Sequence, residues 1–491
     1  MGRAPVEYPM VDLNSFASSG NRKSWIDVTD PLWTNLGPGW HDVESDRAAP
    51  GIRYRWSQGE ASVYLWNPHP RGRLTLQVFA GGPPRRATTV LQLGLRGQRL
   101  EDCEIRSHGW EDLTLDYCAP VGPLEIRVRT RDTWRPDDAL GNGDRRELGL
   151  AFRRFELKPH GSLSLQPIPI SVIIPTFNRV GKLSAVLKAL AAQTLDRQQF
   201  EVVVVNDGST DATSAWMREF AARSPLNLKY YEQPHQLQSA ARNLGIAMST
   251  NPIVLFLGDD IVPQPTLLEE HLRCHRANGN CPNIAVLGHI DWLETLRATP
   301  FMRYVGRYGA QFGYALIKEH VPISFKCFYT SNVSVHREML SRLDHCFDQD
   351  FATYGWEDIE LGYRLEKAGM RLLYHPAAVA YHDHHLRVDE FCRRQFTTGQ
   401  SSRVFIKKHP ELEPMLGRAE GMKSWIGAGA TWELIKEVVN FLDQRLRIRL
   451  PWFCYHALLA RYYAAGVLSI PCSHKLTVAA ATHSQELRRA A

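Results

Sequence analysis

Hydrophobic and polar residues alternate in short segments over the first third of the chain. Gly, Pro and Asp residues separate these segments, which include ASVYLWN (61–67), GRLTLQVFA (72–80), LTLDYCA (113–119) and LEIRVRT (124–130). Alternation with a period of two is typical of strands that bury one face. Many short strands separated by turns predict an all-β sandwich or jelly roll over residues 1–165.

Continuous hydrophobic runs replace this alternation after Ile170. The runs ISVIIP (170–175), VVVV (202–205) and IVLFL (253–257) are each followed by a segment with helical periodicity, such as VGKLSAVLKALAAQ (180–193). Strands that are buried on both faces and alternate with helices predict an α/β domain with parallel strands in a Rossmann-like mixed sheet. We place this domain at residues 166–388, and we expect a mostly helical region at residues 389–491.

The composition narrows the range of partners and compartments. The 491 residues carry a net charge of +6, which permits an acidic partner such as a nucleotide but does not require one. We expect no nucleic-acid partner, because no basic run with interleaved aromatic residues is present. The nine scattered cysteines form no CxxC pair, which favours a reducing compartment over a disulfide framework.

The termini and hydrophobic runs bear on localisation. The N-terminal segment MGRAPVEYPMVDLN lacks the apolar core of a signal peptide, and no run of about 18 apolar residues predicts a spanning helix. We therefore expect a cytoplasmic protein. The segment FCYHALLARYYAAGVLSI (453–470), interrupted by His456 and Arg461, predicts a helix packed in the core. Peripheral contact of the C-terminal helices with the inner face of the membrane is the alternative. Nothing in the sequence indicates an oligomeric state.

Polar motifs follow three of the predicted strands, namely PTFN (175–178), NDGSTD (206–211) and GDD (258–260). The carboxyl ends of parallel strands meet at one edge of a sheet, where ligands bind in open α/β folds. We therefore expect a ligand site at this edge. Taken alone, NDGSTD is equally typical of a turn followed by a helix cap at Ser209 or Thr210.

Two adjacent acids end the third of these strands. Carboxylates ~4 Å apart repel each other by roughly 4 kcal/mol at an effective dielectric constant near 20, so Asp259 and Asp260 need a positive neighbour. A divalent cation shared with substrate phosphates would meet that need, because Mg²⁺ and similar hard ions prefer oxygen ligands. A solvated turn at the end of a strand is the alternative.

Six motifs together resemble the family-2 glycosyltransferases of the GT-A fold. IPTFNR, VVNDGSTD, SAARNLG, LFLGDDI, YTSNVSVHR and GWEDIELGYRLEKAG occur in the family's order and spacing over about residues 170–385. The resemblance implies an inverting enzyme that transfers a sugar from a nucleotide diphosphate donor to an acceptor hydroxyl.

The resemblance also implies roles in binding the donor. Pro175, Thr176 and Phe177 would line the base pocket, with Phe177 stacked on a uracil. Asp207 would contact the base and the ribose, and Arg242 would lie near the donor nucleotide.

The acidic metal motif departs from the family pattern at its first position. Asp259 and Asp260 match its last two positions, whereas Gly258 stands where many members have an Asp. Asp260 is then the expected ligand of Mn²⁺ or Mg²⁺, and Asp259 a contact to the ribose or to a metal ligand. His382, within VAYHDHH (379–385), matches a histidine that completes the metal site in many relatives. A purely structural histidine is the alternative.

The motif GWEDIELGYRLEKAG supplies the expected catalytic base. Glu357 and Asp358 begin a predicted helix that ends near Gly369, and the helix dipole favours ionised acids in the first turn. By resemblance, Asp358 takes the proton of the acceptor hydroxyl, and Glu357 positions the acceptor. The alternative is that acids are simply common in first turns.

Two further residues are candidates for sugar contacts. By resemblance, Asn332 in SFKCFYTSNVSVHR (324–337) would hydrogen-bond the donor sugar or the acceptor, and Trp356 would stack on a sugar ring. A polar residue facing solvent and a tryptophan packed in the core are the alternatives. GAGATW (427–432) begins like a dinucleotide-binding loop, but Trp432 replaces the third glycine and no strand precedes it.

These observations favour a metal-dependent transferase that uses a UDP-sugar donor. The expected acceptor is a glycan or lipid-linked saccharide of a bacterial surface polysaccharide. The N-terminal region resembles carbohydrate-binding modules in its β-sandwich pattern and its tryptophans, although most of those tryptophans are equally expected in a core. A non-catalytic glycan-binding scaffold is the alternative function. A sugar-phosphate nucleotidyltransferase is less favoured, because the first loop, PTFNRVGK (175–182), is not glycine-rich.

Overall fold

The computed structural model describes most of the chain. The described residues are 24–29, 36–45, 52–80, 88–95, 98–106, 109–119, 121–159, 168–308, 311–317, 322–352, 355–416 and 429–469. The chain divides into two compact units, one formed by residues 1–166 with 276–281 and the other by residues 167–275 with 282–491.

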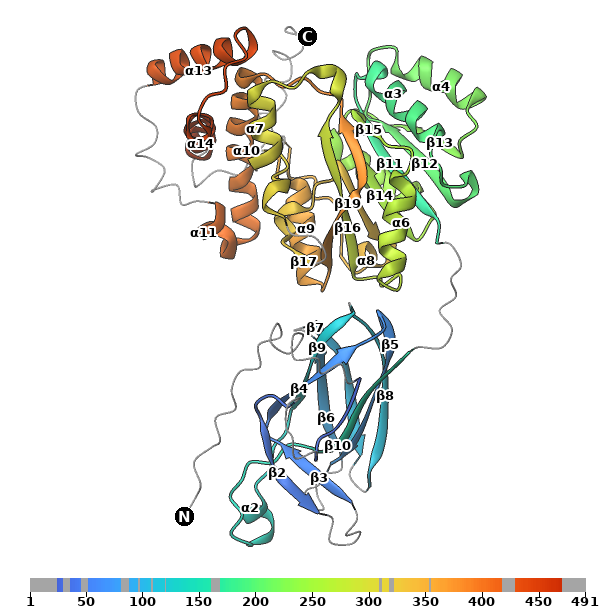
Figure 1. Ribbon diagram of the computed structural model, residues 1–491, viewed down its shortest axis with the longest axis vertical. Coiled ribbons are helices and arrows are strands. Elements are labelled where there is room, and N and C mark those ends of the chain that lie inside the picture. Colours follow the sequence, from blue (N-terminus) through green and yellow to red (C-terminus); the bar gives the residue numbers. More distant parts are fainter. Residues whose placement is uncertain are drawn as a thin grey trace. The chain divides into compact units, whose positions relative to one another are not determined.

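The first unit is a sandwich of two antiparallel sheets (Figure 1). One sheet has the order β2-β3-β10-β5-β8, with β1 paired to β10, and the other has the order β4-β9-β6-β7. The strands are β1 (Trp25–Asp27), β2 (Trp40–Ser45), β3 (Arg53–Ser57), β4 (Glu60–Asn67), β5 (Arg71–Phe79), β6 (Thr88–Leu95), β7 (Gln98–Arg106), β8 (Glu111–Cys118), β9 (Gly122–Thr130) and β10 (Ala151–Pro159). A short helix, α2 (Pro136–Leu140), precedes β10. Alternate residues of both sheets meet in one hydrophobic core, as the period of two predicts.

The tryptophans of this unit are mostly packed. Trp40 is 2% exposed and lies edge-on to Phe152 in the core. Trp56 is also buried, and Trp66, Trp110 and Trp134 are half-buried. These five tryptophans contribute to packing, with part of the surface of the half-buried ones left exposed, and Trp25 is 46% exposed beside Arg154.

One disulfide departs from the expectation of reduced thiols. Cys118 at the end of β8 is bonded to Cys281, in the segment 276–281 that belongs to the same compact unit. The six other cysteines of the described residues form no disulfide. Because 163 residues separate the two partners, no local spacing motif announces the pair.

The second unit is built on a mixed sheet of order β13-β12-β11-β14-β18-β16-β19-β15, with β17 paired to β19. The strands are β11 (Ile170–Thr176), β12 (Phe200–Asn206), β13 (Leu228–Glu232), β14 (Ile253–Leu257), β15 (Ile261–Pro263), β16 (Ile284–Trp292), β17 (Pro322–Ile323), β18 (Asn332–His336) and β19 (Arg371–His382). The first four strands are parallel, and β18 joins β14 in the antiparallel direction. The α/β prediction is therefore confirmed, with a sheet that is mixed beyond β14.

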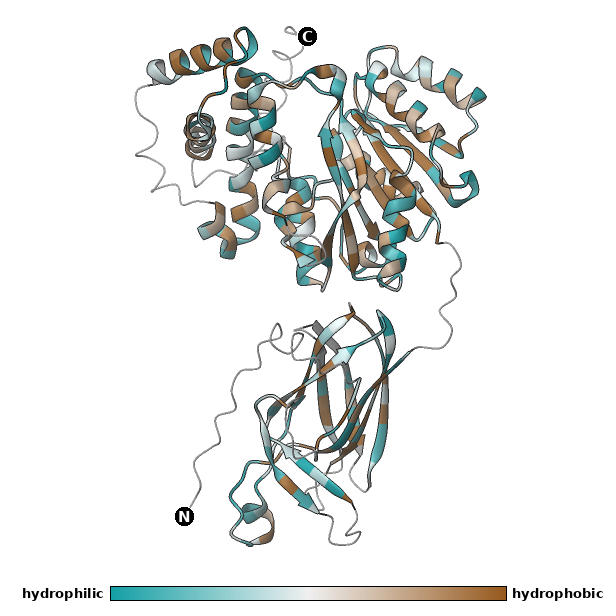
Figure 2. Ribbon diagram, viewed as in Figure 1, coloured by the Kyte–Doolittle hydropathy of each residue, from teal (hydrophilic) through white to brown (hydrophobic). Residues whose placement is uncertain are grey.

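Both faces of the parallel strands are covered, which explains their continuous hydrophobic runs (Figure 2). In β12, Val202 and Val204 face the core that contains α3 (Val180–Ala191), whereas Val203 and Val205 pack against Ala241 of α5 (Leu237–Met248). Helix α5 approaches the sheet so closely at Gly245 that an added Cβ would lie 2.4 Å from a methyl carbon of Ile173.

The remaining helices flank the sheet and extend the unit. They are α4 (Thr213–Arg223), α6 (Leu267–Ala277), α7 (Pro300–Tyr308), α8 (Arg337–Ser341), α9 (Glu357–Lys367), α10 (Val388–Lys408), α11 (Glu413–Leu416), α13 (Gly429–Gln444) and α14 (Trp452–Ser469). Within the described residues, no helix is both long and apolar enough to cross a membrane.

A buried polar cluster joins β18 to α6. Asn332 and Ser334 point to one side of the strand, and His271 spans them with Nδ1 2.9 Å from the Ser334 hydroxyl and Nε2 2.9 Å from Asn332 Oδ1. His275, one helical turn further along, places Nε2 2.8 Å from the same hydroxyl. Burial lowers the pKa of His271 to about 4 and that of His275 well below its usual value. Both imidazoles are therefore neutral in the folded protein at neutral pH.

This cluster predicts a loss of stability in mild acid. An unfolded histidine binds a proton near pH 6.5, whereas folded His271 resists protonation down to about pH 4, so lowering the pH through this window favours unfolding. We expect His271→Gln to reduce the loss of unfolding free energy between pH 8 and pH 5 by about 2 kcal/mol. Urea unfolding of both proteins at both pH values measures this difference. An identical pH dependence in the two proteins would contradict the assignment.

Candidate active site

The first two polar loops meet at the carboxyl edge of the sheet. The Asn178 side chain, just after β11, accepts a hydrogen bond from the backbone N–H of Thr210, 2.7 Å away. Its own backbone N–H donates to the Ser209 hydroxyl, 2.9 Å away. Asn178 has a φ of 53°, the left-handed conformation that Asn tolerates better than most residues. PTFN and NDGSTD therefore form one connected surface, as their positions after neighbouring strands predict.

Asp207 is held rigidly at the start of the second loop. Its carboxylate accepts hydrogen bonds from Gln233 Nε2 at 2.7 Å and from the backbone N–H of Gln236 at 2.9 Å. The Nδ1 atom of His235 lies 2.8 Å from its other oxygen. The ring of Phe177 stacks on His235 with centroids 4.2 Å apart. Phe177 and Asp207 therefore lie around the same histidine, which the sequence did not single out.

A positive neighbour separates the two adjacent acids, and it is an arginine. Arg179 Nη1 lies 3.1 Å from Asp259 Oδ1 and 2.9 Å from Asp260 Oδ2. Thr176 donates its hydroxyl hydrogen to the other oxygen of Asp259, 2.8 Å away. Arg179 is the last residue of the motif IPTFNR. The sequence alone predicts no role for it.

Two histidines approach Asp260 from the end of β19. His382 Nε2 lies 3.4 Å and His384 Nδ1 3.7 Å from Asp260 Oδ2. Potential ligand atoms of these three residues all lie within 4.8 Å of one another, so the group could hold a metal ion. Trp292 stacks on His382 with centroids 5.2 Å apart and fixes its orientation. Asp260 and His382 are the metal ligands that the sequence predicts. His384 is an additional candidate that the structure places beside them.

Gly258 has a steric reason to replace the first acid of the motif. A Cβ at this position would lie 2.8 Å from Ile261 Cγ1 and 3.1 Å from Asp260 Oδ1. An aspartate would therefore crowd the strand that follows. The two remaining acids, Asp259 and Asp260, both pair with Arg179, and Asp260 also lies 3.4 Å from His382 Nε2.

Burial and charge set the ionisation of the acidic pair. Burial raises the pKa of Asp259 to about 6, although Arg179 opposes the increase. Burial acts in the same direction on Asp260, but its hydrogen bond and charge interaction with His382 hold its pKa below the usual value. Burial and the charge of His382 lower the pKa of His384 to about 4. Asp260 and neutral His384 are therefore both in the state that binds metal at neutral pH.

The first turn of α9 carries the second acidic group. Glu357 is buried, with Oε1 3.1 Å from Arg242 Nη1 and 2.6 Å from the amide nitrogen of Gln238, both from α5. Its second oxygen, Oε2, is buried without a hydrogen-bond partner. Arg242 therefore supplies the counter-charge of Glu357. Its predicted position near the donor nucleotide stays a prediction.

Asp358 lies beside Glu357 and is partly buried. The backbone N–H groups of Ile359 and Thr330 donate hydrogen bonds to its carboxylate. Burial nevertheless raises the pKa of Asp358 to about 7, and the charge of Glu357 adds to the increase. The residue after Thr330 connects back to the acidic pair, because Ser331 O accepts a hydrogen bond from the Gly258 N–H. Residues 330–331 therefore link Asp358 to Gly258, the residue that precedes the acidic pair.

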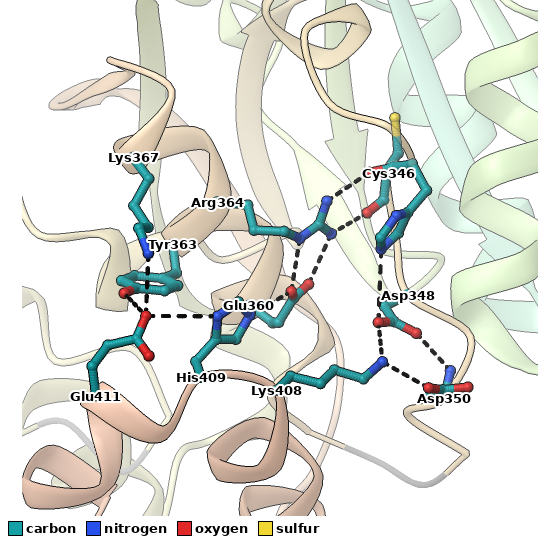
Figure 3. A network of polar contacts seen from close by, with 11 residues as sticks. Cys346, Asp348, Asp350, Glu360, Tyr363, Arg364, Lys367, Lys408, His409 and Glu411 are labelled. Atoms are coloured by element: carbon teal, nitrogen blue, oxygen red, sulfur yellow. Dashed lines mark hydrogen bonds and ion pairs between the residues drawn. The ribbon is translucent and has the colours of Figure 1, made fainter.

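A polar network holds the body of α9 in place (Figure 3). Glu360 accepts hydrogen bonds from Arg364 Nε at 2.7 Å and from His409 Nε2 at 3.0 Å. Arg364 also donates to the backbone oxygen atoms of His345 and Cys346. Since His409 caps α10, the network joins α9 to α10 and to the loop that precedes α9. It fixes the helix whose first turn presents Asp358.

Two of the expected sugar contacts are engaged elsewhere. Asn332 is completely buried, and its amide donates to the backbone oxygens of His289 and Ala378 while its oxygen meets His271. Trp356, the residue just before α9, has a φ of 73° and donates its indole hydrogen to Thr398 O in α10. The polar atoms of Asn332 are therefore engaged within the protein, whereas Trp356 is partly exposed and its sugar contact stays a prediction.

Comparison with known proteins agrees with this geometry. Residues 171–340 match the family model described as glycosyl transferase family 2. The chain is 30% identical over 279 residues to validoxylamine A glucosyltransferase of Streptomyces hygroscopicus subsp. jinggangensis, covering 52% of this chain and 64% of that protein. It is 28% identical over 262 residues to chondroitin synthase of Escherichia coli, covering 47% of this chain and 37% of that protein. The matches thus span less than two thirds of either relative.

Among solved structures, the mannosyltransferase PcManGT of Pyrobaculum calidifontis, in complex with GDP-Man and Mn²⁺, has a TM-score of 0.41 and 19% identity, covering 62% of this chain and 87% of that chain. The family match and the curated relatives coincide with the sheet edge that carries the three polar motifs. Residues 171–340 of this chain therefore form a glycosyltransferase domain of family 2.

Proposed function

We propose that this protein transfers a sugar from a UDP-sugar to a hydroxyl group of a glycan or lipid-linked saccharide, with inversion at the anomeric carbon. The observation that carries the proposal is the position of Asp358 in the first turn of α9, where residues 330–331 link it to the sheet edge that holds Asp207 and Asp260; burial also raises its pKa. These residues would supply a base, a nucleotide contact and a cation site.

Each residue of the candidate site has a separate proposed role in an inverting transfer. Asp207 and the ring of Phe177 would bind the nucleoside, and Asp259 would contact its ribose. The Asp358 carboxylate would take the proton of the acceptor hydroxyl as that oxygen attacks the anomeric carbon and the bond to the diphosphate breaks. Glu357, held by Arg242 and Gln238, would position the acceptor beside Asp358.

Asp260, His382 and His384 would hold a divalent ion. One carboxylate with two imidazoles suits Mn²⁺ better than Mg²⁺, which prefers oxygen ligands alone. When bound, the ion would offset the negative charge that develops on the leaving diphosphate. Arg179 occupies the same acidic pair in this structure and would have to release Asp260 for the ion.

The pKa of Asp358 predicts how transfer depends on pH. Below about pH 7 the carboxylate is protonated and cannot accept the acceptor's proton, so activity should rise with pH. We expect kcat/KM to increase roughly tenfold between pH 6 and pH 8, as a single essential base requires. Initial rates at saturating Mn²⁺ measure this profile. A flat profile over this range would remove Asp358 from the role of base.

The class of acceptor is inferred from the relatives. A chondroitin synthase and a validoxylamine A glucosyltransferase are among them, so both a polymer and a small acceptor occur in the set. We favour a growing bacterial surface polysaccharide, made on the cytoplasmic side of the membrane, because the N-terminal sandwich gives this chain a second unit that can hold a glycan.

A half-buried aromatic cluster supports that role for the N-terminal unit. Tyr54, Phe79 and Trp110 pack together, with the ring centroids of Phe79 and Trp110 5.5 Å apart. Aromatic rings at a surface can stack on sugar faces. We expect Trp110→Ala to weaken retardation of the full chain in gels containing the acceptor polysaccharide by several-fold while leaving donor hydrolysis unchanged. Equal retardation of both proteins would leave the cluster a structural feature.

A non-catalytic scaffold is the competing function. Release of nucleotide from a panel of nucleotide-sugars, with and without Mn²⁺, separates the two. Metal-dependent release from one UDP-sugar establishes the enzyme and names the donor. No release, together with no thermal stabilisation by UDP and Mn²⁺, would favour the scaffold.

A further inference from the structure

Helix α13 presents an apolar face outward. Leu434, Val438 and Phe441 recur at the spacing of one helical face, and Leu434 and Phe441 are 66% and 56% exposed. The segment that follows carries four more exposed hydrophobic residues, Leu446, Ile448, Trp452 and Phe453. We call these seven residues, with Ile435, the α13 surface.

The inner side of α13 is firmly packed, so the outward face is not the result of a loosely attached helix. Val439 is buried in a core shared with α7, α10 and α14. The buried carboxylate of Asp443 accepts a hydrogen bond from the backbone N–H of Phe301, 2.7 Å away. A surface helix normally buries its apolar face and exposes a polar one. Here the exposed side is apolar as well, and an exposed patch of this kind marks an interaction site.

The charged residues next to the α13 surface are mainly basic and favour a negatively charged partner. Arg445, Arg447 and Arg449 alternate with Leu446 and Ile448, all of them exposed, and residues 445–453 contain no acid. On α13 itself, Lys436 pairs with Glu433 and Glu437, which leaves one net negative charge among these three residues against the three arginines. Arginine stems can lie along apolar surface while their charged ends reach a polar layer. Trp452 and Phe453 are residue types that favour the boundary between lipid headgroups and acyl chains.

We propose that the α13 surface docks on an anionic lipid membrane and lies in the headgroup region. This contact is independent of the transfer reaction and needs no residue of the candidate active site. A second copy of the chain is a less favourable partner than a membrane. A symmetric dimer would place the same surface of both chains in contact, and the arginines of the two chains would then repel each other. Acidic lipids complement those arginines.

Vesicle sedimentation of the full-length protein tests the proposal. We expect binding to vesicles of phosphatidylcholine with 30% phosphatidylglycerol and much weaker binding to phosphatidylcholine alone. Each arginine near an anionic surface contributes about fivefold in affinity, so Arg445→Gln with Arg449→Gln should weaken binding on the order of thirtyfold. Arg447 is left unchanged because it also donates to the backbone oxygen of Arg297. Leu434→Ser with Phe441→Ser should abolish binding.

The matched control replaces two exposed arginines of α4, Arg218→Gln with Arg223→Gln, and should bind like the parent. Equal thermal melting and UDP release would show that each variant is folded. Failure of the parent to sediment with either vesicle, or equal binding by all variants, would overturn the proposal. A dimer in light scattering that Leu434→Ser with Phe441→Ser dissociates would assign the surface to a second copy instead.

Discussion

Asp358→Asn is expected to lower the rate of sugar transfer by a factor of about 10²–10⁴, the usual contribution of a positioned base. The amide keeps the size of the carboxylate, and its oxygen can still accept the hydrogen bond from the Ile359 N–H. It cannot take a proton from the acceptor. The raised pKa of Asp358 gives the wild-type carboxylate the basicity that an ordinary surface aspartate lacks at pH 7. Donor binding should change little, because the proposed nucleotide contacts are on other loops.

Single-turnover transfer and calorimetric UDP binding, measured on the same preparation, separate these effects. Asp389→Asn is the matched control, since Asp389 also lies in the first turn of a helix, α10, and pairs there with Arg387 and Arg393. It should transfer at the parental rate. Normal transfer by Asp358→Asn would assign the base elsewhere, and loss of UDP binding would show that the substitution disturbs the donor site.

The parallel strands could be predicted from the sequence because burial on both faces requires a continuous run of hydrophobic residues. The run Val202–Val205 requires apolar neighbours above and below, and α3 and α5 provide them. Helix α9 begins at Glu357, and Gly369, with a φ of 95°, follows its end, as the motif predicts. The gathering of Thr176, Asp207 and Asp260 at one sheet edge follows from the parallel order of β11, β12 and β14.

The partners of individual side chains could not be predicted in the same way. Asn332 looks like other polar strand residues in sequence, but His271, from a helix more than 60 residues away, engages its amide oxygen. Arg242 is expected near the nucleotide, but its pairing with Glu357, 115 residues later, could not be predicted. The disulfide and the outward apolar face of α13 are equally non-local. Helical periodicity shows that a face is apolar, but not whether a neighbour covers it.

The position of Arg179 means that the proposed divalent ion would have to displace a guanidinium from the acidic pair. With Arg179 between them, Asp259 and Asp260 have their repulsion offset without any metal. A divalent ion has the larger charge, and it also gains the two imidazoles, which an arginine cannot use. Arg179 released in this way would carry its charge into a pocket of about 440 Å³ lined by Lys182 and Asp383. The leaving diphosphate would then meet both the ion and a freed guanidinium.

Asp260→Asn is therefore expected to abolish the response of transfer to Mn²⁺ and to lower turnover by about a hundredfold or more, since an ion on a leaving diphosphate contributes several kcal/mol. The amide removes the negative charge that both Arg179 and the ion require, while His382 and His384 remain. Titration of Mn²⁺ against UDP release, with Mn²⁺ binding followed separately by electron paramagnetic resonance, measures both effects. Asp389→Asn is again the control, because Asp389 pairs with Arg387 and Arg393 in α10 and lies outside the group of potential ligands. It should keep the parental Mn²⁺ response. An Asp260→Asn variant with unchanged Mn²⁺ dependence would show that the ion is held by other groups, and Asp260 would then serve only as the counter-charge of Arg179.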